Sequence, residues 1–231
     1  MRSDFFKGMY HGFPIGLGYL SVSFGFGIMA IKAGLSVLAA VGISITNLTS
    51  AGQAAGVGII AAGGTIIEMI FTQLIINIRY SLMAVSLTQK LDGSFTTLQR
   101  MICSFGITDE AYAVAISQPG TISSSYMRGL ILTPIIGWVS GTFFGAVAGQ
   151  LLPTSISNAM GIMLYGMFIA IIVPPAKKNN KVILAILLAA GINTLIVYCA
   201  PFISSGFAVI ISALIAAIVT ALLFPVEEVE Q

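Results

Sequence analysis

Residues 68–87 read EMIFTQLIINIRYSLMAVSL, and this stretch decides the class of fold. Glu68 and Arg79 are the only charged residues in it, and most of the others are apolar. A helix needs about 20 such residues to cross a hydrocarbon core of about 30 Å. The stretch therefore predicts a membrane-spanning helix.

The rest of the chain has the same character. Of its 231 residues, 57% are hydrophobic and 8% are charged, and the mean hydropathy is +1.02. Soluble domains carry about 25% charged residues. We predict an all-α, polytopic transmembrane helical bundle of seven or eight spans that forms one membrane domain over residues 1–231. The expected spans are 12–31, 35–62, 65–88, 127–150, 156–173, 180–199 and 202–224, and 101–118 either crosses as an eighth or re-enters.

The positions of Lys and Arg leave two orientations open. Basic residues favour the cytoplasmic side of a membrane. Eight spans fit a cytoplasmic N-terminus, and seven spans fit an external one. Both orientations place Lys177, Lys178 and Lys181 in the cytoplasm. The N-terminal stretch lacks a short apolar core followed by a small-residue cleavage site, so we expect no removable signal peptide.

A weak internal repeat links two glycine-rich stretches. PIGLGYLSVSFGFG, residues 14–27, resembles PIIGWVSGTFFG, residues 134–145. Transporters are often built from two such halves, here about 8–90 and 127–200. Shared glycine content is the alternative explanation. In the second stretch a glycine recurs at every fourth position from 137 to 149, which predicts close approach of a helix from this chain or from a second protein.

Polar residues interrupt the second expected span. SITNLTSAGQAAG, residues 44–56, places Asn47, Thr49, Ser50 and Gln53 at membrane depth. Polar groups in hydrocarbon need partners in protein, water or ligand. One explanation is a broken helix near residues 47–52, whose exposed N–H groups and positive dipole end suit a carboxylate. The alternative is an intact helix whose polar side chains bond to neighbouring helices.

The third span carries a polar face. Its members are Glu68, Thr72, Gln73, Asn77 and Arg79. Glu68 and Arg79 lie about 16 Å apart along a helix axis, so each needs another partner. An arginine inside a membrane almost always faces an interior and pairs with another group. Asp109 and Glu110 are the natural partners of Arg79, because the other carboxylates lie near the termini or in the loop 88–100.

Asp109 and Glu110 stand in SFGITDEAYAVAIS, residues 104–117. Thr108 or Asp109 could cap a helix that begins near residue 110. Alternatively, a carboxylate here faces a cavity, where it balances Arg79, holds a substrate ammonium or takes up a proton. Adjacent residues of a helix point about 100° apart, so both roles are compatible. The candidate residues for substrate binding or coupling are therefore Asn47, Thr49, Ser50, Gln53, Glu68, Asn77, Arg79, Thr108, Asp109 and Glu110.

Several classes of function are not expected. The chain has one histidine and two cysteines, with no Ser–His pair, HExxH, GxSxG or phosphate-binding GxxxxGK[ST] motif. No metal-ligand spacing occurs, and the basic residues are dispersed along the chain. We expect no enzyme activity, cofactor, metal or nucleic-acid partner.

The motifs together resemble the AzlC family of bacterial branched-chain amino acid permeases. The resemblance rests on GFPIGLGYLSVSFGFGIMA (12–30), TSAGQAA (49–55), NIRYSLMAVSL (77–87) and FGITDEAYAVA (105–115), in that order. It covers most of the chain and is strongest over residues 12–118. Ser50 replaces the phenylalanine that usually precedes Ala-Gly in the family, and Tyr80 replaces a usual histidine.

The resemblance implies export of leucine, isoleucine, valine or analogues across the bacterial cytoplasmic membrane. It also implies a small membrane partner of the AzlD type. We expect proton coupling through Asp109 or Glu110 as the energy source. The alternatives are a channel or uniporter for another small zwitterionic or polar solute, and a non-transporting membrane scaffold.

Overall fold

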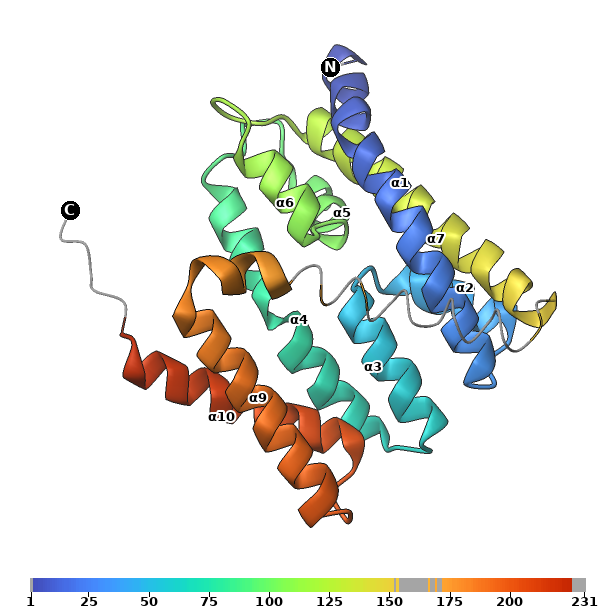
Figure 1. Cartoon of the computed structure of the whole chain (residues 1–231). Helices are drawn as coiled ribbons and strands as arrows, with labels where there is room; N and C mark the ends of the chain where they lie inside the picture. Colours follow the sequence, from blue (N-terminus) through green and yellow to red (C-terminus); the bar gives the residue numbers. More distant parts are fainter. Residues whose placement is uncertain (1, 152, 154–165, 167–168, 170–171, 226–231) are drawn as a thin grey trace. The chain divides into compact units, whose positions relative to one another are not determined.

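The computed structural model describes residues 2–151, 153, 166, 169 and 172–225, and these are mainly helical (Figure 1). Within that part of the chain the isolated β-bridge between Leu91 and Ile122 is the only β pairing. The helices are α1 (Arg2–Lys32), α2 (Val37–Thr46), α3 (Ser50–Ala61), α4 (Ile66–Thr88), α5 (Thr97–Phe105), α6 (Asp109–Ile116), α7 (Ser124–Leu151), α9 (Asn180–Cys199) and α10 (Ser205–Leu223). The all-α prediction is confirmed for these residues.

Five of the described helices are long and apolar enough to cross a membrane, namely α1, α4, α7, α9 and α10. They correspond to five of the expected spans, although α1 begins well before residue 12. The expected span 156–173 falls largely outside the described residues. The total of seven or eight spans is therefore not confirmed.

The expected span 35–62 is broken, which is one of the two possibilities left open by the sequence. Helices α2 and α3 contain 10 and 12 residues, and Asn47–Thr49 separate them. Each helix is about 15–18 Å long at 1.5 Å per residue, so neither crosses a 30 Å core alone. The polar residues at 47–49 thus mark the end of one helix and the start of the next.

The segment 101–118 is not a single crossing helix, which corrects one of the two possibilities left open by the sequence. It contains most of α5 and all of α6, helices of 9 and 8 residues. Each is about 12–14 Å long, less than half of the hydrocarbon core. The physical reason lies in the link between them: Gly106 terminates α5, and Thr108 caps α6.

The chain divides into two compact units, Met1–Val57 with Ile76–Leu164 and Gly58–Ile75 with Tyr165–Gln231. We call them the first and the second unit. In the second unit α9 and α10 pack against each other. This division does not test the predicted repeat halves or the single membrane domain.

The first unit is organised by the contact between α1 and α7, the most extensive between any two described helices. A Cβ atom added to Gly137, Gly141 or Gly145 would collide with the backbone of α1. The glycine stripe therefore packs within this chain. Close backbone approach of this kind is how helices associate in lipid without large apolar side chains.

A cluster of buried apolar side chains lies beside this helix pair. It joins the end of α4 to α5, α6 and the start of α7, and includes Leu87, Cys103, Ile107, Met127 and Ile131. The cluster holds the α5–α6 link against α7, because Ile131 packs directly over Gly106. This link positions the residues described next.

Candidate functional site

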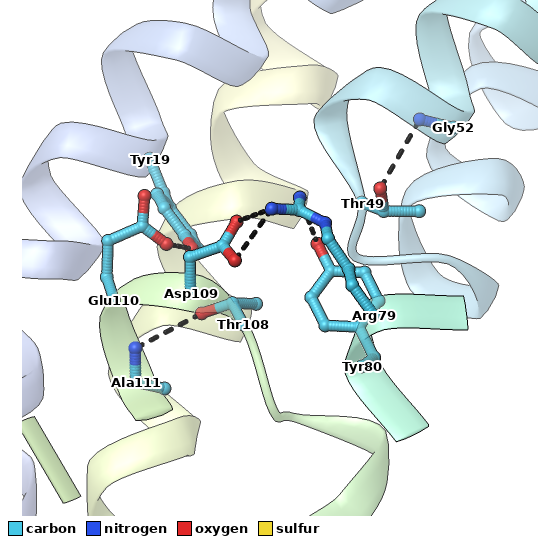
Figure 2. Close-up of polar contacts among 9 residues, drawn as sticks. All are labelled: Tyr19, Thr49, Gly52, Arg79, Tyr80, Thr108, Asp109, Glu110 and Ala111. Atoms are coloured by element: carbon cyan, nitrogen blue, oxygen red, sulfur yellow. Dashed lines mark hydrogen bonds and ion pairs between the residues drawn. The ribbon is translucent and has the colours of Figure 1, made fainter. Parts of the chain in front are cut away.

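The break between α2 and α3 has a defined geometry. The Asn47 side-chain oxygen accepts a hydrogen bond from the Thr49 backbone N–H at 3.2 Å. The Thr49 hydroxyl accepts one from the Gly52 backbone N–H at 3.3 Å, so Thr49 caps α3 (Figure 2). Asn and Thr side chains of this kind compete with the backbone ladder and favour turns and helix caps. The local sequence thus explains why the helix stops and restarts here.

Gln53 clamps the two sides of the break. Its amide nitrogen donates to the Asn47 carbonyl, and its amide oxygen accepts from the Ser44 hydroxyl at 3.4 Å. Ser44 in turn lies 2.7 Å from the Thr142 hydroxyl on α7. Gln53 and Thr142 are both buried. The contacts of Gln53 therefore support the shape of the break.

A cavity of about 220 Å³ opens at this break. Three groups of residues line it: the residues Thr46–Thr49 of the break, Asn77 and Tyr80 of α4, and Ser104, Phe105 and Ile107 around the α5–α6 link. All of them belong to the first unit. We call this space the break cavity. Its wall combines backbone and side-chain polar groups with apolar side chains.

The start of α6 forms a second part of the site. Thr108 is the N-cap of α6, and its hydroxyl accepts a hydrogen bond from the Ala111 backbone N–H at 3.3 Å. Asp109 and Glu110 follow in the first helical turn, where carboxylates interact favourably with the positive end of the helix dipole. The predicted cap is thus confirmed, with Thr108 as the capping residue.

Substitution of the cap tests its contribution to stability. Thr108→Val keeps the shape of the side chain but removes the acceptor, and we expect it to lower the free energy of unfolding by about 1 kcal/mol. Thr108→Ser keeps the hydroxyl and should behave as wild type. Thermal unfolding of the protein in detergent measures the difference. Equal stability of the valine variant and wild type would show that the cap contributes nothing.

Asp109 forms an ion pair with Arg79. The Arg79 guanidinium lies 2.7 Å from the Asp109 carboxylate, and the side chains are 45% and 37% exposed (Figure 2). The same guanidinium donates to the Tyr80 hydroxyl at 3.2 Å and lies 4.9 Å from the centre of the Tyr80 ring. The predicted pairing of Arg79 is confirmed. Since Tyr80 also lines the break cavity, the ion pair adjoins it.

Glu110 has a different partner. It accepts a hydrogen bond from the Tyr19 hydroxyl of α1, and the Tyr19 ring packs edge-on against Trp138 of α7 at 5.2 Å. Figure 2 shows the two carboxylates pointing in different directions, Asp109 toward α4 and Glu110 toward α1. The first turn of α6 therefore contacts α4 through Asp109 and α1 through Glu110.

Glu68 belongs to the second unit, and the groups that donate hydrogen bonds to its carboxylate lie in the same unit. Its carboxylate accepts hydrogen bonds from the Ser204 hydroxyl at 2.6 Å and from the Gly206 backbone N–H at 2.8 Å. Both donors are at the start of α10, and Glu68 is buried. The carboxylate therefore caps α10, which satisfies the sequence-based expectation that Glu68 has a partner other than Arg79.

The structure thus sorts the candidate residues. Asn47, Thr49 and Asn77 line the break cavity, and Arg79 and Asp109 form an ion pair beside it. The other candidates have structural positions: Ser50 begins α3, Gln53 bonds across the break, Thr108 caps α6, Glu110 contacts α1 and Glu68 caps α10. The sequence alone did not single out Tyr19, Phe105 or Ile107 as site residues. Phe105 and Ile107 directly precede the Thr-Asp-Glu motif, and that adjacency was the available signal.

Comparison with known proteins identifies one matching family model and several related membrane proteins. The family model described as AzlC protein matches residues 14–152. A protein of Archaeoglobus fulgidus described as an uncharacterized membrane protein is 29% identical over 178 residues, covering 76% of this chain and 78% of that protein. The inner membrane protein YgaZ of Escherichia coli is 24% identical over 206 residues, with 86% and 84% covered. A Helicobacter pylori protein, also described as an uncharacterized membrane protein, is 23% identical over 185 residues. No solved structure matches the chain.

Proposed function

Because the chain belongs to the AzlC family of membrane proteins, we propose that it exports branched-chain amino acids, such as leucine, isoleucine and valine. The observation that carries the proposal is the cavity of about 220 Å³ at a broken helix beside an ion pair. At roughly 30 Å³ for each water, its volume equals about seven water molecules, which suits a small solute.

The break offers both ends of an amino acid a partner. The N-terminus of α3 carries the positive end of a helix dipole, which favours a carboxylate. The C-terminus of α2 presents carbonyl oxygens and the negative end, which favour an ammonium group. Discontinuous membrane helices bind charged substrate groups in this way in other transporters. Leu48, Phe105 and Ile107 supply the apolar part of the wall.

The ion pair then has a role apart from direct binding. Arg79 and Asp109 neutralise each other, so neither charge is free for the substrate in this conformation. We propose that the pair closes the site next to Tyr80, and that Asp109 or Glu110 takes up the proton that drives export. Protonation of Asp109 would release Arg79, whereas protonation of Glu110 would change its contact with Tyr19.

The remaining parts of the proposal concern location and partner. The name of the Escherichia coli relative supports a place in the bacterial inner membrane. We also propose a small AzlD-type membrane subunit as the partner, as the resemblance described in the sequence analysis implies. Neither proposal includes enzyme activity, a cofactor or a metal.

The direct test is export of radiolabelled leucine and valine from preloaded cells that express the chain with its small neighbouring membrane protein. Wild type should export both, and Asn77→Leu should lower the rate about fivefold, since one hydrogen bond to a ligand is worth about 1 kcal/mol. Gly18→Leu is the control, because nothing lies within 4 Å of its added Cβ. Absence of export by wild type with its partner would refute the proposal.

A channel or uniporter is the second candidate, favoured by the polar wall of the break cavity. The same assay separates the two mechanisms. Export that stops when the proton gradient is collapsed supports a coupled exporter, whereas export that continues supports a channel.

A further inference from the structure

A second, smaller cavity adjoins the break cavity. It has a volume of about 110 Å³ and lies in the first unit between α4, α5 and α7. Five buried residues line it, namely Leu87, Phe95, Cys103, Ile107 and Met127. We call this space the aliphatic cavity.

The two helices that enclose the aliphatic cavity each present one face to it. Helix α4 contributes Ala84, Leu87 and Thr88, and Leu91 follows it. Helix α5 contributes Arg100, Cys103 and Ser104, and Ile107 follows it. Both sets follow the spacing i, i+3, i+4 and i+7, which places side chains on one side of a helix. The cavity is therefore a feature of two facing helix surfaces rather than a gap beside one small residue.

The aliphatic cavity is open in part, because Thr88, Arg100 and Ser104 on its wall are exposed. The rest of its wall is almost entirely apolar. An apolar group from a ligand would be buried there, which is worth about 0.8 kcal/mol for each methylene.

Ile107 and Ser104 lie between the two cavities, because both residues line each of them. Ile107 is 8% exposed and stands in the link between α5 and α6, directly before the Thr108 cap. The break cavity, whose wall is mixed, and the aliphatic cavity are therefore neighbours. A ligand with a charged head and an apolar tail matches this arrangement.

We infer that the aliphatic cavity receives the side chain of the transported amino acid while the break cavity holds its ammonium and carboxylate groups. This inference rests on the proposed transport function and assigns side-chain selectivity to Ala84, Leu87, Cys103 and Ile107. At roughly 30 Å³ for each water-sized group, the cavity takes about four such groups. That size matches a branched side chain of three or four carbons.

The test is competition between amino acids in an exchange assay, with membrane vesicles that contain the chain and its small partner. Each buried methylene is worth about fourfold in affinity, so wild type should prefer leucine, with three more carbons, to alanine by about 60-fold. Ala84→Leu fills the cavity and should reduce this preference to a fewfold while alanine exchange remains. Ser81→Leu is the matched control, because it adds a similar apolar side chain at an exposed position of the same helix.

A second variant acts in the opposite direction. Leu87→Ala enlarges the aliphatic cavity and should allow phenylalanine to compete with leucine. Competition by phenylalanine in Leu87→Ala tests the inference even if Ala84→Leu fails to reach the membrane. Wild-type selectivity in both inserted variants would overturn the inference and leave the cavity to a lipid chain or to packing.

The outcomes also separate this inference from the proposed function. If wild type exchanges amino acids without regard to side-chain size, transport stands and the aliphatic subsite is wrong. If wild type exchanges no amino acid, the proposed function fails, and the subsite inference fails with it.

Discussion

Arg79→Gln alone is expected to lower transport tenfold to a hundredfold, and Asp109→Asn alone should do the same. Each variant leaves one member of the ion pair without its partner. Arg79 is the fourteenth residue of α4, about 20 Å from its start and about 14 Å from its end, which is near the middle of a spanning helix. A charged side chain at that depth costs about 2.5–3.5 kcal/mol.

The expected loss of transport is a range because the Arg79 and Asp109 side chains are partly exposed. A cost of about 2.8 kcal/mol corresponds to about a hundredfold change in the population of a state. Both side chains are more than a third exposed, so part of the interaction is screened. The lower limit of tenfold reflects this screening.

The double variant distinguishes a gate from a packing contact. Arg79→Gln with Asp109→Asn removes both charges, so the protein should insert and fold better than either single variant while transport stays low. Arg128→Gln is the control, since Arg128 bonds to Ser124 of its own helix. Membrane fractionation and leucine export are measured on the same cells. Normal export by the single variants would show that the pair takes no part in transport.

Gly141→Leu is expected to abolish accumulation of folded protein in the membrane. An added Cβ at residue 141 meets the Leu20 carbonyl and the Ser23 hydroxyl of α1. The obstacle is partly helix backbone, which has no rotamer with which to move aside. Overpacking of a core costs about 1–3 kcal/mol even where side chains adjust, so this substitution should exceed that range.

The same change at an open glycine provides the comparison. Gly18→Leu adds an identical side chain to α1 where nothing lies within 4 Å. It should insert and remain monodisperse in detergent by size-exclusion chromatography, whereas Gly141→Leu should aggregate or be degraded. Equal behaviour of the two variants would contradict the close packing of α1 and α7.

Local features of the site were predictable from the sequence. The break at Asn47–Thr49 follows from Asn and Thr side chains that bond to nearby backbone groups. The cap at Thr108 has the same origin. Arg79 could be matched to the Thr-Asp-Glu motif because few carboxylates lie away from the termini and the loop 88–100, and an intramembrane arginine requires a partner.

The sequence did not show which of the two adjacent carboxylates pairs with Arg79. Asp109 pairs with Arg79 and Glu110 with Tyr19, although the two carboxylates are adjacent and chemically alike. Their directions depend on where α1 and α4 pass α6. For the same reason Gln53, expected at the substrate, bridges Asn47 and Ser44, and Glu68 caps the start of α10.

The sequence by itself determined the helical membrane class and most helix boundaries among the described residues, and it offered the break and the cap as possibilities. These features depend on hydrophobic length and on bonds within a few residues. Only the tertiary structure decided that the glycine stripe of α7 faces α1 and that two cavities meet at Ile107. Those features arise from contacts between residues far apart in the chain. Spacing along one helix predicts which side chains share a face, but the neighbour of that face depends on how the helices pack.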